Sequence, residues 1–155
     1  LRPVRESREG KPRAKAGAPA KAEAKASPFA RFTTSDGFAV LRGKNARANH
    51  ALLSRVAGHD YWLHAEHGPS AHVVLRRDHP GVEVPEASLL QAATLCANKS
   101  AGAADGRVEV MVAEVRHVRK VKGLAHGTVR VDRVWRVVAV APDPGLEASL
   151  RVEAP

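Results

Sequence analysis

Short apolar runs separated by turn signals predict that the middle of the chain is a β-sheet. Tyr61-Trp62-Leu63 and Val73-Val74-Leu75 are rich in aromatic or β-branched residues, and Gly68-Pro69 lies between them. A Gly-Pro pair is a strong turn signal, and such runs are typical of strands. We therefore expect two strands of one sheet at about 60–64 and 71–77.

The same pattern recurs on both sides of this central pair. Asp36-Gly37 lies between apolar runs and predicts a hairpin of strands near 29–34 and 38–42. The valines at 108, 110 and 112 occupy alternate positions, which predicts a half-buried strand that continues, extended, to residue 123. A last antiparallel pair is expected at about 128–131 and 134–140, turning at Asp132-Arg133.

Two stretches have the period of a helix. From Asn45, a residue suited to the N-cap, apolar positions recur on one face until Gly58. A second helix is expected from Glu86 to Ala101, with Cys96 as a small residue on its buried stripe. The resulting order, β-β-α-β-β-α-β-β-β, predicts one α+β domain with a mainly antiparallel or mixed sheet.

Composition divides the chain into three parts. Residues 1–27 hold 8 basic and 3 acidic side chains among Ala, Pro and Gly, which is typical of a disordered basic linker. The domain is expected over 28–142, and 143–155 are expected to form a loose C-terminal tail after Pro142 and Pro144. Because a linker joins two parts and no initiator Met is present, we expect a further domain upstream.

The chain is strongly basic, with 25 Lys and Arg against 16 Asp and Glu. This excess favours a polyanionic partner such as nucleic acid. Cys96 is the single cysteine, so no internal disulfide can form, which fits a reducing cytoplasm. No signal-peptide pattern and no run of about 18 apolar residues is present, so we expect a cytoplasmic protein without a membrane partner.

Two basic surfaces are candidates for binding RNA phosphates. The first is the start of the first helix, with Lys44, Arg47 and Asn49. The second, which we call the cationic ribbon, is the segment 116–122. Its expected contact residues are Arg116, His117, Arg119, Lys120 and Lys122. Aromatic residues are few, so contact with the shape and backbone of a structured RNA is favoured over stacking along a single strand.

A cluster of histidines supports an alternative, a metal-dependent hydrolase. His64, His67 and His72 could supply three zinc ligands. The supporting pattern is weak, because no His-Glu-x-x-His helix and no cysteine pair accompanies them. Gly-x-Ser-x-Gly, Gly-x-Gly-x-x-Gly and Walker motifs are also absent, so we expect no metal, no cofactor and no enzymatic activity.

Five segments between about Pro28 and Pro142 resemble, in order and with natural spacing, the NFACT RNA-binding domain. They are Ser35-Asp36-Gly37-Phe38, Gly43-Lys44-Asn45-Ala46-Arg47-Ala48-Asn49, Asp60-Tyr61-Trp62-Leu63-His64-Ala65, His72-Val73-Val74-Leu75-Arg76 and His117-Val118-Arg119-Lys120-Val121-Lys122-Gly123. The fourth segment adds His72 and Arg76 to the expected RNA contacts.

The resemblance implies the C-terminal module of an NFACT protein. Bacterial members act in ribosome-associated quality control, where they bind the large ribosomal subunit that holds a stalled chain and hold tRNA while a C-terminal alanine tail is added. It thus implies large-subunit rRNA and tRNA as partners, a coiled coil and N-terminal domains upstream, and a non-catalytic role here. The older family label, fibronectin-binding protein, leaves a protein-interaction or adhesion module as a further alternative.

Overall fold

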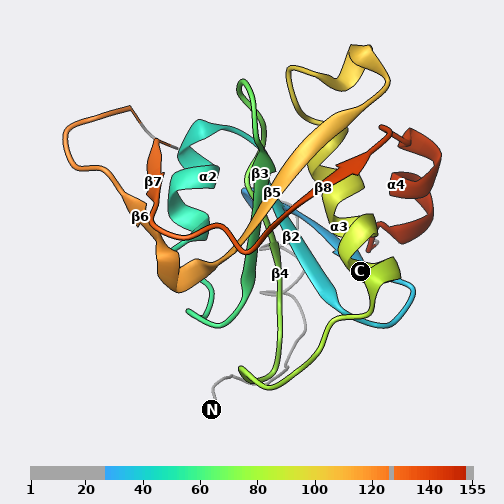
Figure 1. Cartoon of the computed structure of the whole chain (residues 1–155), viewed down its shortest axis with the longest axis horizontal. Coiled ribbons are helices and arrows are strands. Elements are labelled where there is room, and N and C mark those ends of the chain that lie inside the picture. Colours follow the sequence, from blue (N-terminus) through green and yellow to red (C-terminus); the bar gives the residue numbers. More distant parts are fainter. Residues whose placement is uncertain (1–26, 126–127, 153–155) are drawn as a thin grey trace. The chain divides into compact units, whose positions relative to one another are not determined.

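A six-stranded antiparallel sheet forms the centre of the part of the chain that the computed structural model describes, residues 27–125 and 128–152. Its strand order is β1-β2-β4-β3-β5-β8, and β6 pairs with β7 in a separate ribbon (Figure 1). The strands are β1 (Phe29–Thr33), β2 (Ala39–Gly43), β3 (Tyr61–Ala65), β4 (Val73–Leu75), β5 (Val108–Glu114), β6 (Val118–Lys120), β7 (Val129–Val131) and β8 (Arg136–Val140). The α-helices are α2 (Ala46–Leu52), α3 (Glu86–Ala97) and α4 (Pro144–Leu150).

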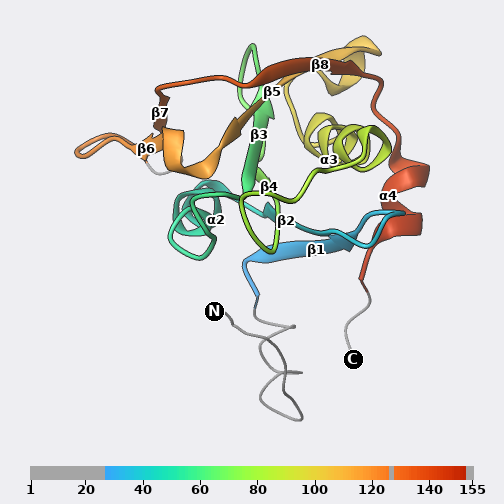
Figure 2. The same cartoon turned by 60° about the horizontal axis from the view of Figure 1, so that its bottom comes forward.

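Both faces of the sheet are buried at its central strand β4. Successive side chains of a strand point to opposite faces. In β4, Val73 and Leu75 therefore join one hydrophobic cluster while Val74 joins the other, and all three are inaccessible to water. Figure 2 shows helices on both sides of the central strands.

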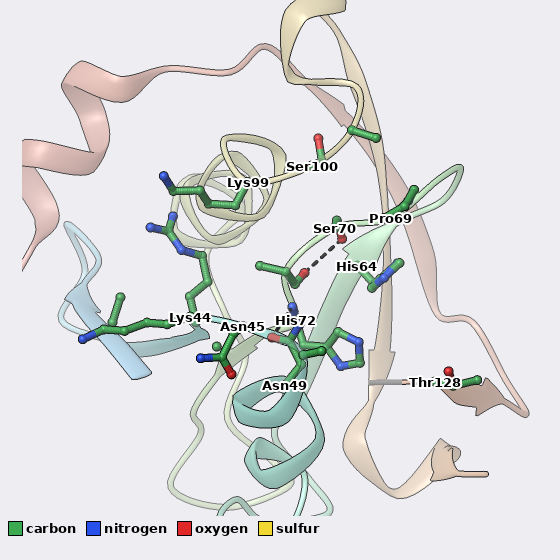
Figure 3. Close-up of a pocket in the computed structure, with 16 residues that line it drawn as sticks. Lys44, Asn45, Asn49, His64, Pro69, Ser70, His72, Lys99, Ser100 and Thr128 are labelled. Atoms are coloured by element: carbon green, nitrogen blue, oxygen red, sulfur yellow. Dashed lines mark hydrogen bonds between the residues drawn. The ribbon is translucent and has the colours of Figure 1, made fainter. Parts of the chain in front are cut away.

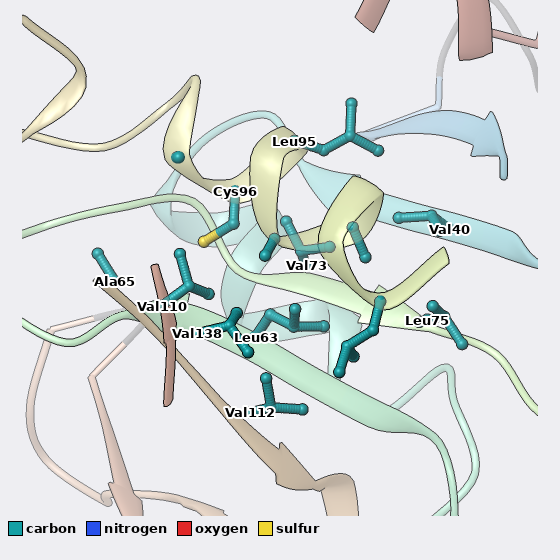
Figure 4. Packing of buried hydrophobic residues seen from close by; sticks show 14 of the residues in the cluster. Val40, Leu63, Ala65, Val73, Leu75, Leu95, Cys96, Val110, Val112 and Val138 are labelled. Carbon is teal, nitrogen blue, oxygen red and sulfur yellow. The ribbon is translucent and has the colours of Figure 1, made fainter. Parts of the chain in front are cut away.

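Helix α3 covers the first face. Its Leu89, Ala93 and Cys96 pack against Val73 and Val110 of the sheet, and Figure 4 shows α3 lying over these strands. Burying one large aliphatic side chain contributes about 1.5–3 kcal/mol, so this layer is a main source of the stability of the domain.

Helix α2 and the β6–β7 ribbon cover the second face. Trp62 is 1 % exposed there and shares a cluster with Leu52 of α2 and Val118 of β6. Asn45 is the N-cap of α2, and its side chain accepts a hydrogen bond from the backbone N of Ala48 at 2.9 Å. The cap, predicted from sequence, is confirmed.

The predicted α+β class is confirmed, as are the first hairpin and the antiparallel pairing of β3 with β4. Both predicted helices end earlier than expected. After Leu52 the chain enters tight turns, in which the N–H groups of Ser54 and Arg55 bond three residues back. After Ala97 the chain leaves the helix and pairs with the segment before β4, where Ala101 N donates a hydrogen bond to Pro69 O at 2.8 Å.

The prediction that the cationic ribbon is one extended strand is wrong. Residues Val115–His117 form a 3₁₀ turn, and only Val118–Lys120 is a strand. The turn forms because Val115 N bonds Asp60 O and Arg116 N bonds Gly58 O, which turns the chain out of the sheet after β5. Arg116 therefore does not continue one face of the strand that carries Lys120.

The predicted pairing of 128–131 with 134–140 is also wrong. Strand β7 pairs with β6, and β8 pairs with β5 at the edge of the main sheet. The segment between them crosses from one sheet to the other, and Trp135 N donates to Val112 O at 2.8 Å as the chain joins β5.

Residues after Pro142 do not form the loose tail expected from the two prolines. Asp143 is instead the N-cap of α4, with Pro144 at a first-turn position that tolerates proline. Beyond the helix, Val152 N bonds Arg31 O at 3.0 Å, so the chain pairs with the β1 edge. The predicted linker lies outside the described residues up to residue 26. Within the described part, no helix is long and apolar enough to cross a bilayer.

A nearly buried ion pair holds α4 against the rest of the domain. Arg42, whose side chain is 5 % exposed, donates hydrogen bonds of 2.8 and 2.9 Å to the two carboxylate oxygens of Glu147. Asn98 and Arg151 donate to the same carboxylate. The hydrogen bonds from Arg42 lower the pKa of Glu147 from 4.5 to about 2, against the raising effect of burial.

We expect Glu147→Gln to lower the free energy of unfolding by about 2 kcal/mol at neutral pH. This is less than the roughly 3–5 kcal/mol of a fully buried pair, because Glu147 keeps some contact with water. Since its pKa is depressed on folding, the stabilisation is present above pH 4.5 and is lost as pH falls toward 2. Urea unfolding between pH 7 and pH 2 measures both effects.

Glu86→Gln is the matched control, because Glu86 also forms a two-bond pair with an arginine, Arg136, but is 59 % exposed. Its effect on stability should be much smaller, since water screens an exposed pair. Equal losses in the two variants, or an unchanged acid sensitivity in Glu147→Gln, would contradict this account of α4.

Candidate nucleic-acid interface

A cavity of about 850 Å³ lies where β4 begins. Three segments far apart in sequence form its wall: 42–49 at the start of α2, 69–72 before β4, and 99–101 after α3. Ala30 of β1, His64 of β3 and Thr128 beside β7 complete the lining, and Figure 3 shows His64 and Thr128 in place. The cavity therefore depends on the tertiary fold and on no single motif.

Lys44 is placed at the cavity by the close packing of the chain between β2 and α2. Its backbone N donates to Pro28 O at 3.0 Å, and Gly43 N donates to His72 O at 3.1 Å. A Cβ at Gly43 would lie 2.1 Å from Oδ1 of Asn49 and 2.9 Å from its backbone N. The absence of a side chain at Gly43 thus allows the turn that presents Lys44.

Lys99 reaches the cavity from the end of α3. Its carbonyl accepts from Ala71 N at 2.9 Å, and Ser100 forms an isolated β-bridge with Ser70. Figure 3 shows Lys44 and Lys99 extending toward the same side of the cavity, with Thr128 on the other side. Two exposed ammonium groups are thereby presented together.

The lining of the cavity contains three cationic residues and no carboxylate. The guanidinium of Arg42 is already compensated by Glu147 and also donates to Leu95 O. Among the described residues, neither Lys44 nor Lys99 forms an ion pair with a carboxylate. The cavity thus has the uncompensated positive charge that attracts phosphate groups.

His72 and Asn49 shape the cavity from within the fold. Oδ1 of Asn49 accepts from His72 N at 3.1 Å and so joins α2 to the start of β4. The ring of His72 is 2 % exposed, and its Nδ1 accepts a hydrogen bond from Trp62 Nε1 at 3.2 Å. An Nδ1 that accepts this bond carries no proton, so His72 is a neutral positioning residue.

The three-histidine metal site is not assembled. His64 and His72 pack with ring centroids 5.1 Å apart, but the side chain of His67 is 81 % exposed and lies near Glu66 and Glu109. Burial lowers the pKa of His64. The hydrolase alternative therefore loses its predicted ligand set.

In the described ranges, Glu66, His67 and Glu109 are the one group of three potential ligands whose atoms lie within 4.8 Å of each other. All three residues are exposed. Cys96 supplies no reactive group either, because burial raises the pKa of its thiol to about 12. The prediction that Cys96 is a buried core residue is confirmed.

Comparison with known proteins identifies the family of this chain. The model of the family described as NFACT protein RNA binding domain matches residues 28–133. The chain belongs to the NFACT RNA-binding domain family. It is 36 % identical over 113 residues to the Rqc2 homolog RqcH of Bacillus subtilis, and the match covers 72 % of this chain and 19 % of that protein.

A solved structure has the same architecture as this NFACT domain. The C-terminal part of the fibronectin/fibrinogen-binding protein from Streptococcus suis superposes with a TM-score of 0.74 at 25 % identity. The match covers 81 % of this chain and 50 % of that one. The chain thus spans at most half the length of each of these two matched chains.

In this NFACT domain, both arginines of the cationic ribbon are paired with carboxylates. Arg116 pairs with Glu114 at 2.8 Å, and Arg119 pairs with Asp132. The two arginines on Asp132, Arg130 and Arg119, lower the pKa of that carboxyl by hydrogen bonding. The ribbon therefore has less free charge than its sequence indicates.

The other predicted contact residues do not line the large cavity. Arg76 is tied to the buried carboxylate of Asp60 at 3.1 Å. Lys122 and Arg47 are exposed, and Lys120 donates to Ser54 Oγ at 2.5 Å. His117 lines a second, smaller cavity. Of the predicted RNA contacts, only Lys44, Asn49 and His72 meet at the large cavity.

Sequence reasoning missed Lys99, the second cation of the cavity. Lys99 lies just after α3, and the only strong pattern in that part of the sequence is the apolar stripe of the helix. A single lysine after a helix is common on protein surfaces and does not indicate a binding site. The antiparallel bridge that brings Ser100 to Ser70 has no local signal in the sequence.

We expect Gly43→Ala to destabilise the domain by about 1–3 kcal/mol, because the added methyl overlaps Asn49. Gly102→Ala is the control, since its Cβ would meet nothing nearer than 3.5 Å. Urea unfolding of both variants checks this, and a Gly43→Ala midpoint equal to that of the control would show that the approach of α2 to β2 is not tight.

Proposed function

We propose that this chain is a non-catalytic RNA-binding module that docks the phosphate backbone of a structured RNA at the cavity between α2 and α3. The observation that carries the proposal is the charge of the lining: Lys44 and Lys99 have no carboxylate partner in the described structure, and the lining includes none. Membership of a family described as RNA-binding supports it.

Lysine side chains are well suited to contact phosphates at this site. An ammonium group is a compact charge with three donors on a flexible stem, so it can follow a backbone whose position varies. The exposed Asn45 and the half-buried Ser100, which line the same cavity, add neutral polar groups. Such contacts fix the position of an RNA without reading its sequence.

We further propose large-subunit rRNA or tRNA as the RNA, in ribosome-associated quality control in the cytoplasm. The similarity to a protein named Rqc2 homolog supports this assignment. Since the chain spans 19 % of that relative, coiled-coil and N-terminal domains of a longer protein would supply the remaining contacts. The cationic ribbon, with Lys120 and Lys122, is proposed as a second and weaker phosphate surface.

We expect Lys44→Ala with Lys99→Ala to weaken RNA binding and to make its salt dependence shallower. Each lost phosphate contact reduces the slope of log K against log salt by about one unit, so the double variant should lose about two. Binding of a blunt RNA duplex and of tRNA, measured by fluorescence anisotropy over a salt series, gives the slope.

Arg107→Ala with Arg130→Ala is the matched control. It removes the same number of charges from side chains that are each 71 % exposed, but both arginines are paired with carboxylates and neither lines the cavity. Its slope should stay close to that of the wild type. Equal slopes in the two double variants would show that net charge alone attracts the RNA, and would overturn the cavity as the site.

A further inference from the structure

Trp135 is a half-exposed ring that the proposed phosphate site does not use. Of the exposed large apolar side chains in the described part of the chain, it is the only aromatic one, at 49 % exposure. One face is stacked on Tyr61, with ring centroids 4.8 Å apart and planes 2° from parallel. The guanidinium of Arg77 lies 4.2 Å from the centre of the Tyr61 ring.

This stack fixes the indole in place. The Arg77 side chain is 4 % exposed and is held by Glu114 and by the carbonyls of Pro80 and Val82. Trp135 N is bonded to Val112 O at 2.8 Å. The guanidinium of Arg136, held by Glu86, lies over the indole at 5.5 Å from its centre, and the residue Trp135 as a whole is 49 % exposed. The ring is therefore a rigid, preformed stacking surface.

The surroundings of the ring suit a single nucleobase. Tyr61 and Trp135 form one side of a cavity of about 220 Å³, which is below the roughly 300 Å³ at which pockets for drug-sized ligands begin. Arg116, His117 and Arg133 line the same cavity. Glu114 lies there too, but it is paired with Arg116 and Arg77. Within the described residues, Arg133 has no carboxylate partner.

We propose that Trp135 stacks an unpaired RNA base, with Arg133 contacting a phosphate that flanks it. Unpaired bases splayed out of a structured RNA are recognised by stacking on aromatic rings, which tolerates any base. Positive charge around the ring favours a nucleotide over an apolar protein segment. This inference rests on the proposed function and specifies which part of the RNA the domain recognises.

The test uses three blunt RNA duplexes that differ at one position: fully paired, one bulged adenosine, and one bulged abasic ribose. Wild-type protein should bind the adenosine bulge at least about fivefold more tightly than the abasic bulge. Trp135→Phe should keep this preference, whereas Trp135→Leu, which keeps apolar bulk without a ring system, should lose it. Val137→Ala, a change at a 43 % exposed residue outside the cavity, should leave it unchanged.

The outcomes separate this inference from the function on which it rests. Lys44→Ala with Lys99→Ala should weaken binding of all three duplexes by a similar factor and preserve the adenosine preference. Equal binding of the adenosine and abasic bulges by wild-type protein would overturn the stacking site and leave the phosphate site standing. A preference that survives in Trp135→Leu would also overturn it. If no duplex binds, both proposals fail.

Discussion

The complete burial of β4 is the constraint from which the rest of the structure follows. Its three residues have no exposed surface, and they point alternately to the two faces of the sheet. Each face must therefore be covered, by α3 on one side and by α2 with the β6–β7 ribbon on the other. The start of α2 and the end of α3 consequently approach β4 from opposite faces, and the large cavity lies where they meet.

Charge compensation distinguishes the structural cations from the proposed functional ones. Arg42 and Arg77 are almost fully buried, and each is paired with a carboxylate, so they stabilise α4 and the end of β4. Lys44 and Lys99 are exposed at a cavity whose lining has no carboxylate, and neither lysine is paired with a carboxylate in the described structure. Some cationic side chains of this basic chain are thus paired with carboxylates inside the fold, and a smaller number remain unpaired and available to a polyanion.

Local pattern was enough to predict most of the elements, because alternation, turn residues and caps act over a few positions. The hairpin at Gly37, the pairing of β3 with β4 and the Asn45 cap all follow from such signals. The start of α4 also has a local signal, the Asp143 cap followed by Pro144, which the prediction of a loose tail overlooked. The other failures depend on contacts between distant residues. Glu147 pairs with Arg42, which is 105 positions away in the sequence. Strand β8 pairs with β5, although the turn at Asp132-Arg133 predicts that it pairs with its neighbour β7.

The site was partly accessible from sequence for the same reason. Lys44 lies in a segment with a helix-start signal, and it does line the cavity. Lys99 and Trp135 are brought to their places by a β-bridge and by sheet pairing, which no short pattern encodes. A buried histidine such as His72 looks like a ligand in the sequence and acts as a positioning residue in the fold.

The most direct test of the central claim is to map the RNA contact by NMR, following the backbone amides as a blunt RNA duplex is added. The account predicts that the largest shifts occur at 43–45 and 99–101, the two segments that carry the unpaired lysines, and that they diminish as salt is raised. Shifts confined to β6 and β7, with the cavity unchanged, would contradict it and would place the phosphate site on the cationic ribbon.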